Sequence, residues 1–138
     1  MRIRKEKIIL DTNIWISFLI SKNFKKLDSL INKGKIQLLF SNELLEEFIT
    51  VAKRPKFEKY FAIDDIEKLL DNFNSYGKII EIKSDIKECR DIKDNFLLNL
   101  AIDGKADYLI TGDNDLLELQ TIQKTKIVSI TDFLKIVK

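Results

Sequence analysis

The sequence contains no histidine among its 138 residues, and it has only one cysteine, one proline and four glycines. The absence of histidine excludes catalysis by Ser-His-Asp or Cys-His groups, a histidine general base and a zinc site with imidazole ligands. If the protein is an enzyme, its carboxylates, its lysines or a metal ion carry the chemistry. The single cysteine, Cys89, leaves no second thiol for an internal disulfide, which favours a reducing, cytoplasmic location.

Long hydrophobic runs are also absent. No apolar run approaches the roughly 20 residues that span a bilayer, so we expect no association with a membrane. The formal net charge of +2 is close to neutral and does not by itself indicate a nucleic-acid binder. A chain with 45% hydrophobic and 33% charged residues has the composition of a folded protein, and its length predicts a single domain over residues 1–138.

Short apolar runs of strand length alternate with segments whose apolar residues recur at helical spacing. The expected strands are 7–10, 36–40, 78–82, 107–110 and 127–130. The expected helices are 12–33, 42–53 after Ser41 as N-cap, two within 56–76 that divide near Ala62, 95–103, 114–119, and a terminal helix capped by Thr131. Continuously apolar strands that alternate with helices predict a parallel sheet covered on both faces.

Carboxylates follow the expected strands at one edge of this sheet. Asp11 comes directly after the first strand, and Asp113 follows "YLIT" and one glycine. Asp94 opens the helix "NFLLNLAID", and Glu47 flanks the apolar stripe of "SNELLEEFITVAKRP", whereas Glu43 and Glu46 point further toward solvent. Because the carboxyl ends of parallel strands meet at one edge, we expect these acids to approach one another.

Each acid taken alone also has an ordinary structural explanation. Asp11 or Asp94 alone is more often a helix cap, "TGDND" alone is more often a turn, and Glu47 alone suits a solvated helix face. Four carboxylates at one edge repel one another unless a cation neutralises them. Oxygen ligands without histidine or thiolate favour Mg²⁺ or Mn²⁺ over zinc, and such an ion suits the hydrolysis of phosphodiesters.

Three stretches, "IILDTNIWIS", "SNELLEEFITVAKRPKF" and "DNFLLNLAIDGKADYLITGDNDLL", together resemble a PIN domain. They most resemble the branch that contains toxins of bacterial and archaeal toxin–antitoxin pairs, the relatives of VapC. The resemblance covers nearly the whole chain. It implies a three-layer α/β/α sandwich with a central parallel sheet, and a Mg²⁺- or Mn²⁺-dependent endoribonuclease.

The resemblance also assigns roles to residues and implies partners. Asp11, Glu47, Asp94 and Asp113 correspond to the four acids that bind metal and catalyse cleavage. Asn13 and Thr111 correspond to polar groups that orient them, and Asp115 corresponds to a frequent extra acid near the site. The hypothesis is hydrolysis of single-stranded or loop RNA by metal-activated water, which leaves 5′-phosphate and 3′-hydroxyl ends. A cognate antitoxin and a homodimer are implied as partners. The RNA target, the antitoxin's identity and the number of metal ions are not implied.

Cations near the site would be needed for the substrate backbone, and Lys53, Arg54, Lys56, Lys93 and Lys105 are candidates, although each equally suits a solvated face. Trp15 could stack on a base, but one turn into an apolar helix it is expected in the core.

Three alternatives to a nuclease stay open. A haloacid-dehalogenase-like phosphatase requires a second aspartate where Asn13 stands, and a receiver-like phospho-acceptor requires an acidic pair near the first strand, where only Glu6 is available. The third alternative is a non-catalytic PIN-type module that binds RNA or protein.

Overall fold

The computed structural model describes residues 6–21, 34–57, 77–85 and 95–136. The sheet contains six strands in the order β3-β2-β1-β4-β6-β5. Their bounds are β1 Glu6–Leu10, β2 Ile36–Phe40, β3 Gly77–Ile79, β4 Tyr108–Ile110, β5 Thr121–Ile122 and β6 Thr125–Val128. All neighbouring strands are parallel except β5, which pairs antiparallel with β6 at one edge.

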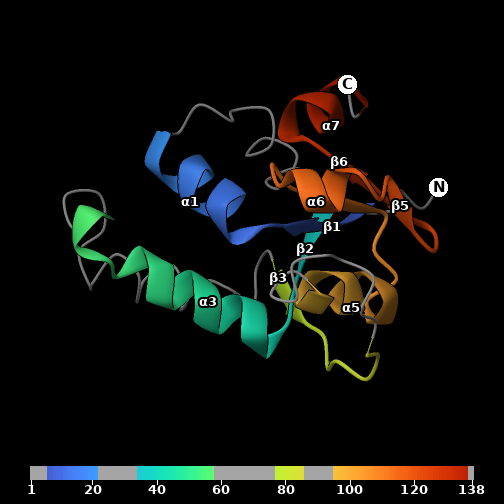
Figure 1. Ribbon diagram of the computed structural model, residues 1–138, viewed down its shortest axis with the longest axis horizontal. Coiled ribbons are helices and arrows are strands. Elements are labelled where there is room, and N and C mark those ends of the chain that lie inside the picture. The colour runs from blue at the N-terminus through green and yellow to red at the C-terminus, as the bar shows by residue number, and fades with distance from the viewer. Residues whose placement is uncertain (1–5, 22–33, 58–76, 86–94, 137–138) are drawn as a thin grey trace.

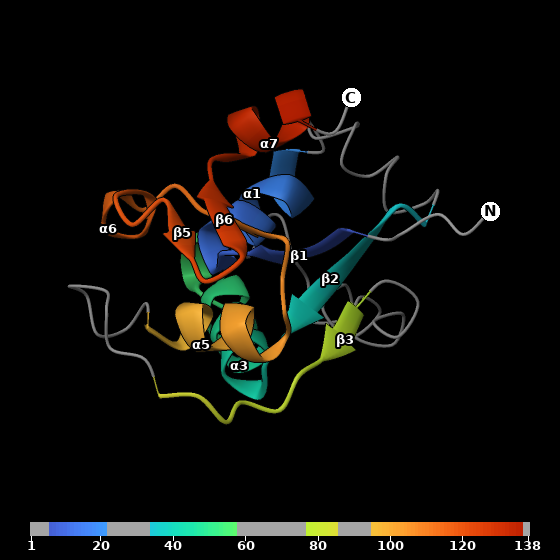
Figure 2. The same cartoon turned by 90° about the vertical axis from the view of Figure 1, so that its right-hand side faces the viewer.

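Helices cover both faces of this sheet. They are α1 Thr12–Ser21, α3 Asn42–Ala52, α5 Asn95–Asp103, α6 Asn114–Leu117 and α7 Ile130–Ile136, with a 3-10 turn, η1, at Pro55–Phe57. In Figures 1 and 2, α3 and α5 lie below the sheet, and α1 and α7 lie above it. The expected three-layer α/β/α architecture with a central, mostly parallel sheet is confirmed.

The centre of the sheet is the centre of the core. Ile8 and Ile9 of β1 and Leu109 and Ile110 of β4 are fully buried, as strands covered on both faces must be. Trp15 is only 3% exposed and packs against Phe40 and Phe48, with ring centroids 5.9 Å away in each case. The expectation that Trp15 belongs to the core is confirmed, and it is therefore not positioned to stack on a base.

The helix that follows β2 forms for the reasons visible in its sequence. The Ser41 hydroxyl accepts a hydrogen bond from the Leu44 backbone N–H at 3.1 Å, so Ser41 is the N-cap, as predicted. Leu44, Phe48 and Val51 recur at helical spacing and are buried against the core. This apolar stripe fixes the rotation of α3 and therefore the direction in which its glutamates point.

Several expected boundaries differ from the structure. The last strand spans Thr125–Val128 rather than 127–130, because its pairing with β4 begins at Lys126 and the following helix already starts at Ile130. Ser129, not Thr131, caps α7: its hydroxyl accepts a hydrogen bond from the Asp132 backbone N–H at 3.1 Å. The strand expected at 78–82 is Gly77–Ile79, and the helix expected at 114–119 is Asn114–Leu117.

Some predictions concern residues outside the described ranges. They include the helix over 22–33, most of the helical segment 56–76, Cys89, Lys93 and the candidate acid Asp94. Within the described ranges, no helix has the length and apolar character needed to cross a bilayer.

Candidate active site

The register of the sheet places the ends of β1 and β4 next to each other. Leu10 pairs with Ile110, and the Asp11 backbone N–H continues the pairing by donating to the Ile110 carbonyl at 3.0 Å. On the other side of β4, the Thr111 backbone N–H donates to the Val128 carbonyl at 3.0 Å. The first residue after each strand is therefore still fixed by the sheet, so the positions of Asp11 and Thr111 follow directly from strand pairing.

Thr111 connects the two strand-end acids through a single hydroxyl. This fully buried side chain donates a hydrogen bond to Asp11 Oδ2 at 2.8 Å and accepts one from the Asp113 backbone N–H at 3.0 Å. One side chain thereby positions both the Asp11 carboxylate and the loop that carries Asp113. The sequence-based expectation that Thr111 lies beside the acids agrees with this geometry.

Asp113 has a structural role as well as a place at the sheet edge. It is the N-cap of α6, where its Oδ1 accepts a hydrogen bond from the Asp115 backbone N–H at 2.8 Å. Asp115, expected as an extra acid near the site, contributes its backbone N–H to this cap. Capping and a place in a site are compatible, because a capping aspartate keeps further oxygen lone pairs for other partners.

The Asp11 carboxyl is in an environment that disfavours its charge. Burial raises its pKa above the ordinary 3.8, and hydrogen bonds from the Thr111 hydroxyl and the backbone N–H groups of Asn13 and Thr12 lower it. The nearby Asp113 raises it further, and the net result is a raised pKa. Among the described residues, the groups that shift this pKa are hydrogen-bond donors and a second carboxylate, and none is a cation. The edge of the sheet therefore combines a partly buried carboxylate with a like charge.

Glu47 reaches the same region from α3. Its Oε2 accepts a hydrogen bond from the Thr12 hydroxyl at 2.7 Å, and Thr12 is itself buried. Among the three glutamates of this helix, Glu47 lines the cavity described below, whereas Glu43 and Glu46 do not. Sequence reasoning missed Thr12, because nothing in a threonine after a strand indicates a partner 35 residues away.

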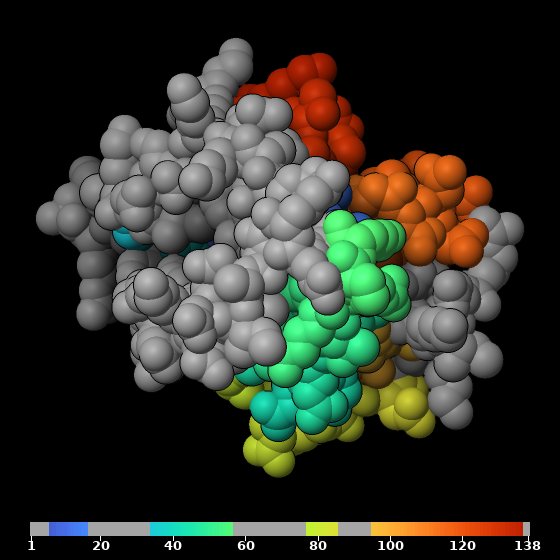
Figure 3. All heavy atoms as spheres, turned by 90° about the vertical axis from the view of Figure 1, so that its left-hand side faces the viewer, coloured from blue at the N-terminus to red at the C-terminus, as the bar shows by residue number. Residues whose placement is uncertain are grey.

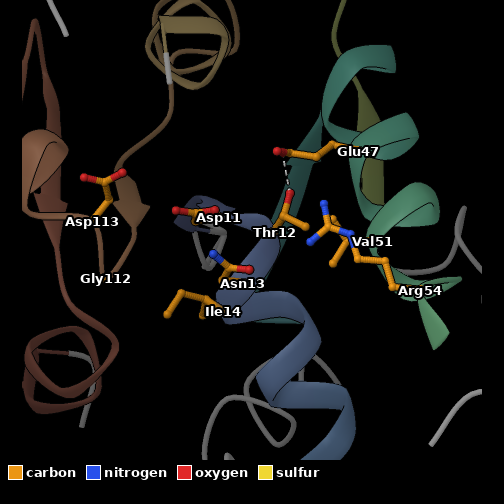
Figure 4. Close-up of a pocket in the computed structure, with 9 residues that line it drawn as sticks. All are labelled: Asp11, Thr12, Asn13, Ile14, Glu47, Val51, Arg54, Gly112 and Asp113. Carbon is orange, nitrogen blue, oxygen red and sulfur yellow. Dashed lines mark hydrogen bonds between the residues drawn. The ribbon is translucent and has the colours of Figure 1, made fainter. Parts of the chain in front are cut away.

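These side chains surround an open cavity of about 500 Å³. It is lined by Asp11, Thr12, Asn13, Ile14, Glu47, Val51, Arg54, Gly112 and Asp113. Figure 3 shows the end of α3 (green) and the segment containing α6 (orange) facing each other, with residues near the N-terminus (blue) visible between them. In Figure 4 the Asp11 carboxylate lies between those of Asp113 and Glu47.

The other predicted residues fall in different places. Asn13 is exposed and lines the cavity. Of the candidate cations, Arg54 lines it, while Lys53 and Lys56 do not, and Lys105 lines a separate cavity with Gln123 and Lys124. Within the described part of the chain, no three acidic side chains lie close enough together to form a metal-binding cluster.

Comparison with known proteins identifies the family. The family described as the PIN domain matches residues 7–115, which is most of the chain. The chain belongs to the PIN domain family. The matched segment includes Asp11, Glu47, Asp94 and Asp113.

Individual relatives of this PIN domain were found in sequence and in structure. The uncharacterized protein MJ1680 of Methanocaldococcus jannaschii is 37% identical over 123 residues, which cover 87% of this chain and 79% of the relative. A crystal structure of VapBC2 from Rickettsia felis, bound to a DNA fragment from its promoter, aligns with a TM-score of 0.53 at 20% identity, over 88% of this chain and 96% of that chain. The PIN domain of human SMG5 aligns at 13% identity with a TM-score of 0.47, over 96% and 99% of the chains.

The donor groups of this PIN domain suit Mg²⁺ or Mn²⁺. Asp11 and Asp113 offer carboxylate oxygens, and Asn13 and Glu47 add oxygens to the lining of the same cavity. Mg²⁺ usually binds to proteins through one or two carboxylates and keeps several waters, so a cluster of three acids is not required. A divalent cation would also offset the burial of the Asp11 charge and its repulsion by Asp113.

Proposed function

We propose that this PIN domain is a Mg²⁺- or Mn²⁺-dependent endoribonuclease that hydrolyses phosphodiester bonds of RNA. The observation that supports this proposal is the cavity at the sheet edge, where one hydroxyl positions Asp11 and the Asp113 loop, and burial disfavours the Asp11 charge. Asp11 and Asp113 would hold the ion. Glu47, and Asp94 by its family position, complete the proposed acidic set. When bound, the ion would lower the pKa of a water molecule and neutralise charge on the phosphate.

The chain's own residues would orient these groups. Thr111 and the backbone N–H groups of Thr12 and Asn13 hold the Asp11 carboxylate in one orientation. The Thr12 hydroxyl directs Glu47 toward the cavity, and Ile14 and Val51 provide apolar wall beside it. These contacts restrict the Asp11 and Glu47 carboxylates to a narrow range of orientations, as efficient metal-assisted hydrolysis requires.

The experiment that tests this proposal compares RNA cleavage with and without added Mn²⁺ after removal of metal by EDTA. We expect cleavage only with Mn²⁺, with 5′-phosphate and 3′-hydroxyl ends, and a loss of roughly 10²–10³-fold in Asp113→Asn. Glu43→Gln is the matched control, because this exposed glutamate of α3 does not line the cavity. Cleavage that persists in EDTA, or 2′,3′-cyclic ends, would contradict the proposal. Absence of cleavage under all conditions would favour a non-catalytic binding module.

As part of the same proposal, the protein is the toxin of a toxin–antitoxin pair and forms a homodimer. The fold shared with the VapBC2 structure supports the toxin assignment, and the homodimer is inferred from the family resemblance alone. Expression of the protein alone should arrest growth of the host, and Asp113→Asn should relieve the arrest. Co-expression with a short DNA-binding protein from the neighbouring gene should also relieve it, and sedimentation should then show a complex of the two.

A further inference from the structure

Arg54 places a positive charge on the wall of the acidic cavity. Among the described residues that line the cavity, Arg54 is the one cationic residue. Three carboxylates, those of Asp11, Glu47 and Asp113, line the same cavity. Figure 4 shows its guanidinium turned from the end of α3 toward the side of Thr12 and Asn13. Asp113 lies on the opposite side of Asp11 in this view.

The backbone around Arg54 is fixed by the end of the helix. The Lys53 N–H donates to the Ile49 carbonyl at 3.2 Å, and the Arg54 N–H donates to the Val51 carbonyl at 3.1 Å. Pro55 then begins the 3-10 turn, and its ring restricts the backbone immediately after Arg54. The backbone position of Arg54 therefore follows from how α3 ends, and Lys53 and Lys56 of the same short segment do not line the cavity.

Arg54 does not neutralise the cavity acids directly. Among the nine residues drawn in Figure 4, the hydrogen bond shown is the one between Thr12 and Glu47. A guanidinium that lines an acidic cavity without bonding to its acids retains its planar set of donors for an anionic ligand.

We propose that Arg54 binds a backbone phosphate of the substrate next to the phosphate that reacts. This inference rests on the proposed function, because the anion it assigns to Arg54 belongs to the nucleic acid that the cavity acids would act on. A polynucleotide carries phosphates at regular intervals, so one can lie at the sheet edge while its neighbour reaches the α3 side of the cavity. Two parallel N–H donors of arginine match two phosphate oxygens, which gives orientation as well as attraction.

Binding without cleavage provides the test. A fluorescein-labelled single-stranded RNA of about 12 nucleotides is titrated with protein in EDTA, and anisotropy gives the dissociation constant over a range of salt concentrations. We expect Arg54→Ala to weaken binding about tenfold, as for the loss of a charge-assisted hydrogen bond at an exposed site. The slope of log K against log salt should become shallower by about 0.7, the value for one phosphate contact on a single strand.

Lys53→Ala is the matched control. It removes the same charge from the neighbouring position, which is also exposed, and Lys53 does not line the cavity. We expect this variant to bind nearly as the wild type, and Arg54→Lys to recover only part of the affinity, because lysine lacks the planar fork. Equal weakening by Lys53→Ala and Arg54→Ala would overturn the proposal in favour of a diffuse charge effect, and so would unchanged binding by Arg54→Ala.

The two proposals fail in distinguishable ways. If the protein cleaves RNA with Mn²⁺ and Arg54→Ala changes neither binding nor KM, the nuclease proposal stands and the role of Arg54 is wrong. If the protein cleaves nothing and Arg54→Ala still weakens RNA binding as expected, the phosphate contact stands and the nuclease proposal is wrong. Thermal unfolding of each variant checks that the exposed substitutions leave the fold intact.

Discussion

Asp11 and Asp103 receive similar hydrogen bonds, and yet their pKa values shift in opposite directions. Asp11 accepts from a threonine hydroxyl and two backbone N–H groups. Asp103, at the end of α5, accepts from the Ser84 hydroxyl at 2.6 Å and from the backbone N–H groups of Lys83 and Ser84 at 2.6 and 2.9 Å. Although burial acts to raise the pKa of Asp103, these bonds and the Lys83 charge hold it below 3.8.

The surroundings explain the opposite shifts. Asp11 is more deeply buried and lies near Asp113, so its three hydrogen bonds do not compensate for the cost of its charge. Asp103 lies at the surface near a lysine, so its hydrogen bonds stabilise the folded chain. The Asp103 carboxylate holds the loop at Lys83 and Ser84 through its hydrogen bonds. The buried charge of Asp11 is destabilising, and a bound divalent cation would offset it. Ionisable groups in surroundings that disfavour their charge are typical of functional sites.

The largest expected difference between the two acids is in catalysis. Asp11→Asn keeps an oxygen that can accept from Thr111 but removes the charge, so we expect RNA cleavage with Mn²⁺ to fall by roughly 10²–10³-fold. Asp103→Asn should change the rate less than about threefold, because Asp103 does not line the cavity. Initial rates at saturating Mn²⁺ measure both. Equally small changes in the two variants would show that the Asp11 charge is not needed for cleavage.

A second comparison concerns the groups that orient the cavity acids. Thr111→Val removes the hydroxyl that contacts both Asp11 and the Asp113 backbone, and we expect a 10–100-fold loss of activity or of Mn²⁺ affinity, the usual cost of losing an orienting partner. Thr111→Ser retains the hydroxyl and should retain most of the activity. Thr12→Val, which releases only Glu47, should cost less, about tenfold. Equal activity of Thr111→Val and Thr111→Ser would show that the Thr111 hydroxyl does not orient the site.

The parts of this arrangement differ in how far the sequence predicts them. That Asp11 and Asp113 lie at the same edge of the sheet follows from two apolar runs and the rule that parallel strands end at one edge. That their strands, β1 and β4, are neighbours is visible only in the structure. The choice of Glu47 among three glutamates follows from the apolar stripe of α3, which fixes the rotation of the helix. The segment containing Asp94 lies outside the described residues, and its place at the edge remains a prediction.

Other features depend on contacts that no local pattern encodes. The hydrogen bond between Thr12 and Glu47 joins residues from different helices. The strand β5 has only two residues, and the turn after it places Gln123 at φ 51° without a glycine or asparagine that would indicate a turn. The sequence did not show which of Lys53, Arg54 and Lys56 lines the cavity. Their side-chain directions depend on how α3 ends, which no local pattern indicates. Exposed turns and side-chain directions at helix ends are decided by tertiary structure.

The two acids should also affect stability in opposite directions when metal is absent. In EDTA at pH 7, we expect Asp11→Asn to raise the free energy of unfolding by about 1 kcal/mol, because it removes a charge that burial and Asp113 disfavour. Asp103→Ala should lower it by about 1 kcal/mol, a value reduced for the exposure of this acid. Urea unfolding measures both changes. Added Mn²⁺ should then stabilise the wild type and Asp103→Ala but not Asp11→Asn, and stabilisation of Asp11→Asn by Mn²⁺ would place the ion elsewhere.

The smallest expected effect is the pH dependence of these differences. The folded pKa of Asp103 lies below 3.8, so the unfolded chain takes up this proton first as the pH falls. The stability that Asp103 contributes is therefore complete well above pH 3.8 and is lost as the pH falls through the folded value. For Asp11 the folded state takes up the proton first, so the cost of its charge disappears as the pH falls toward 3.8. Urea titrations of the wild type and both variants between pH 2.5 and 7 should show the Asp11→Asn difference closing at a higher pH than the Asp103→Ala difference. Closure in the reverse order would mean that burial, not hydrogen bonding, dominates at Asp103.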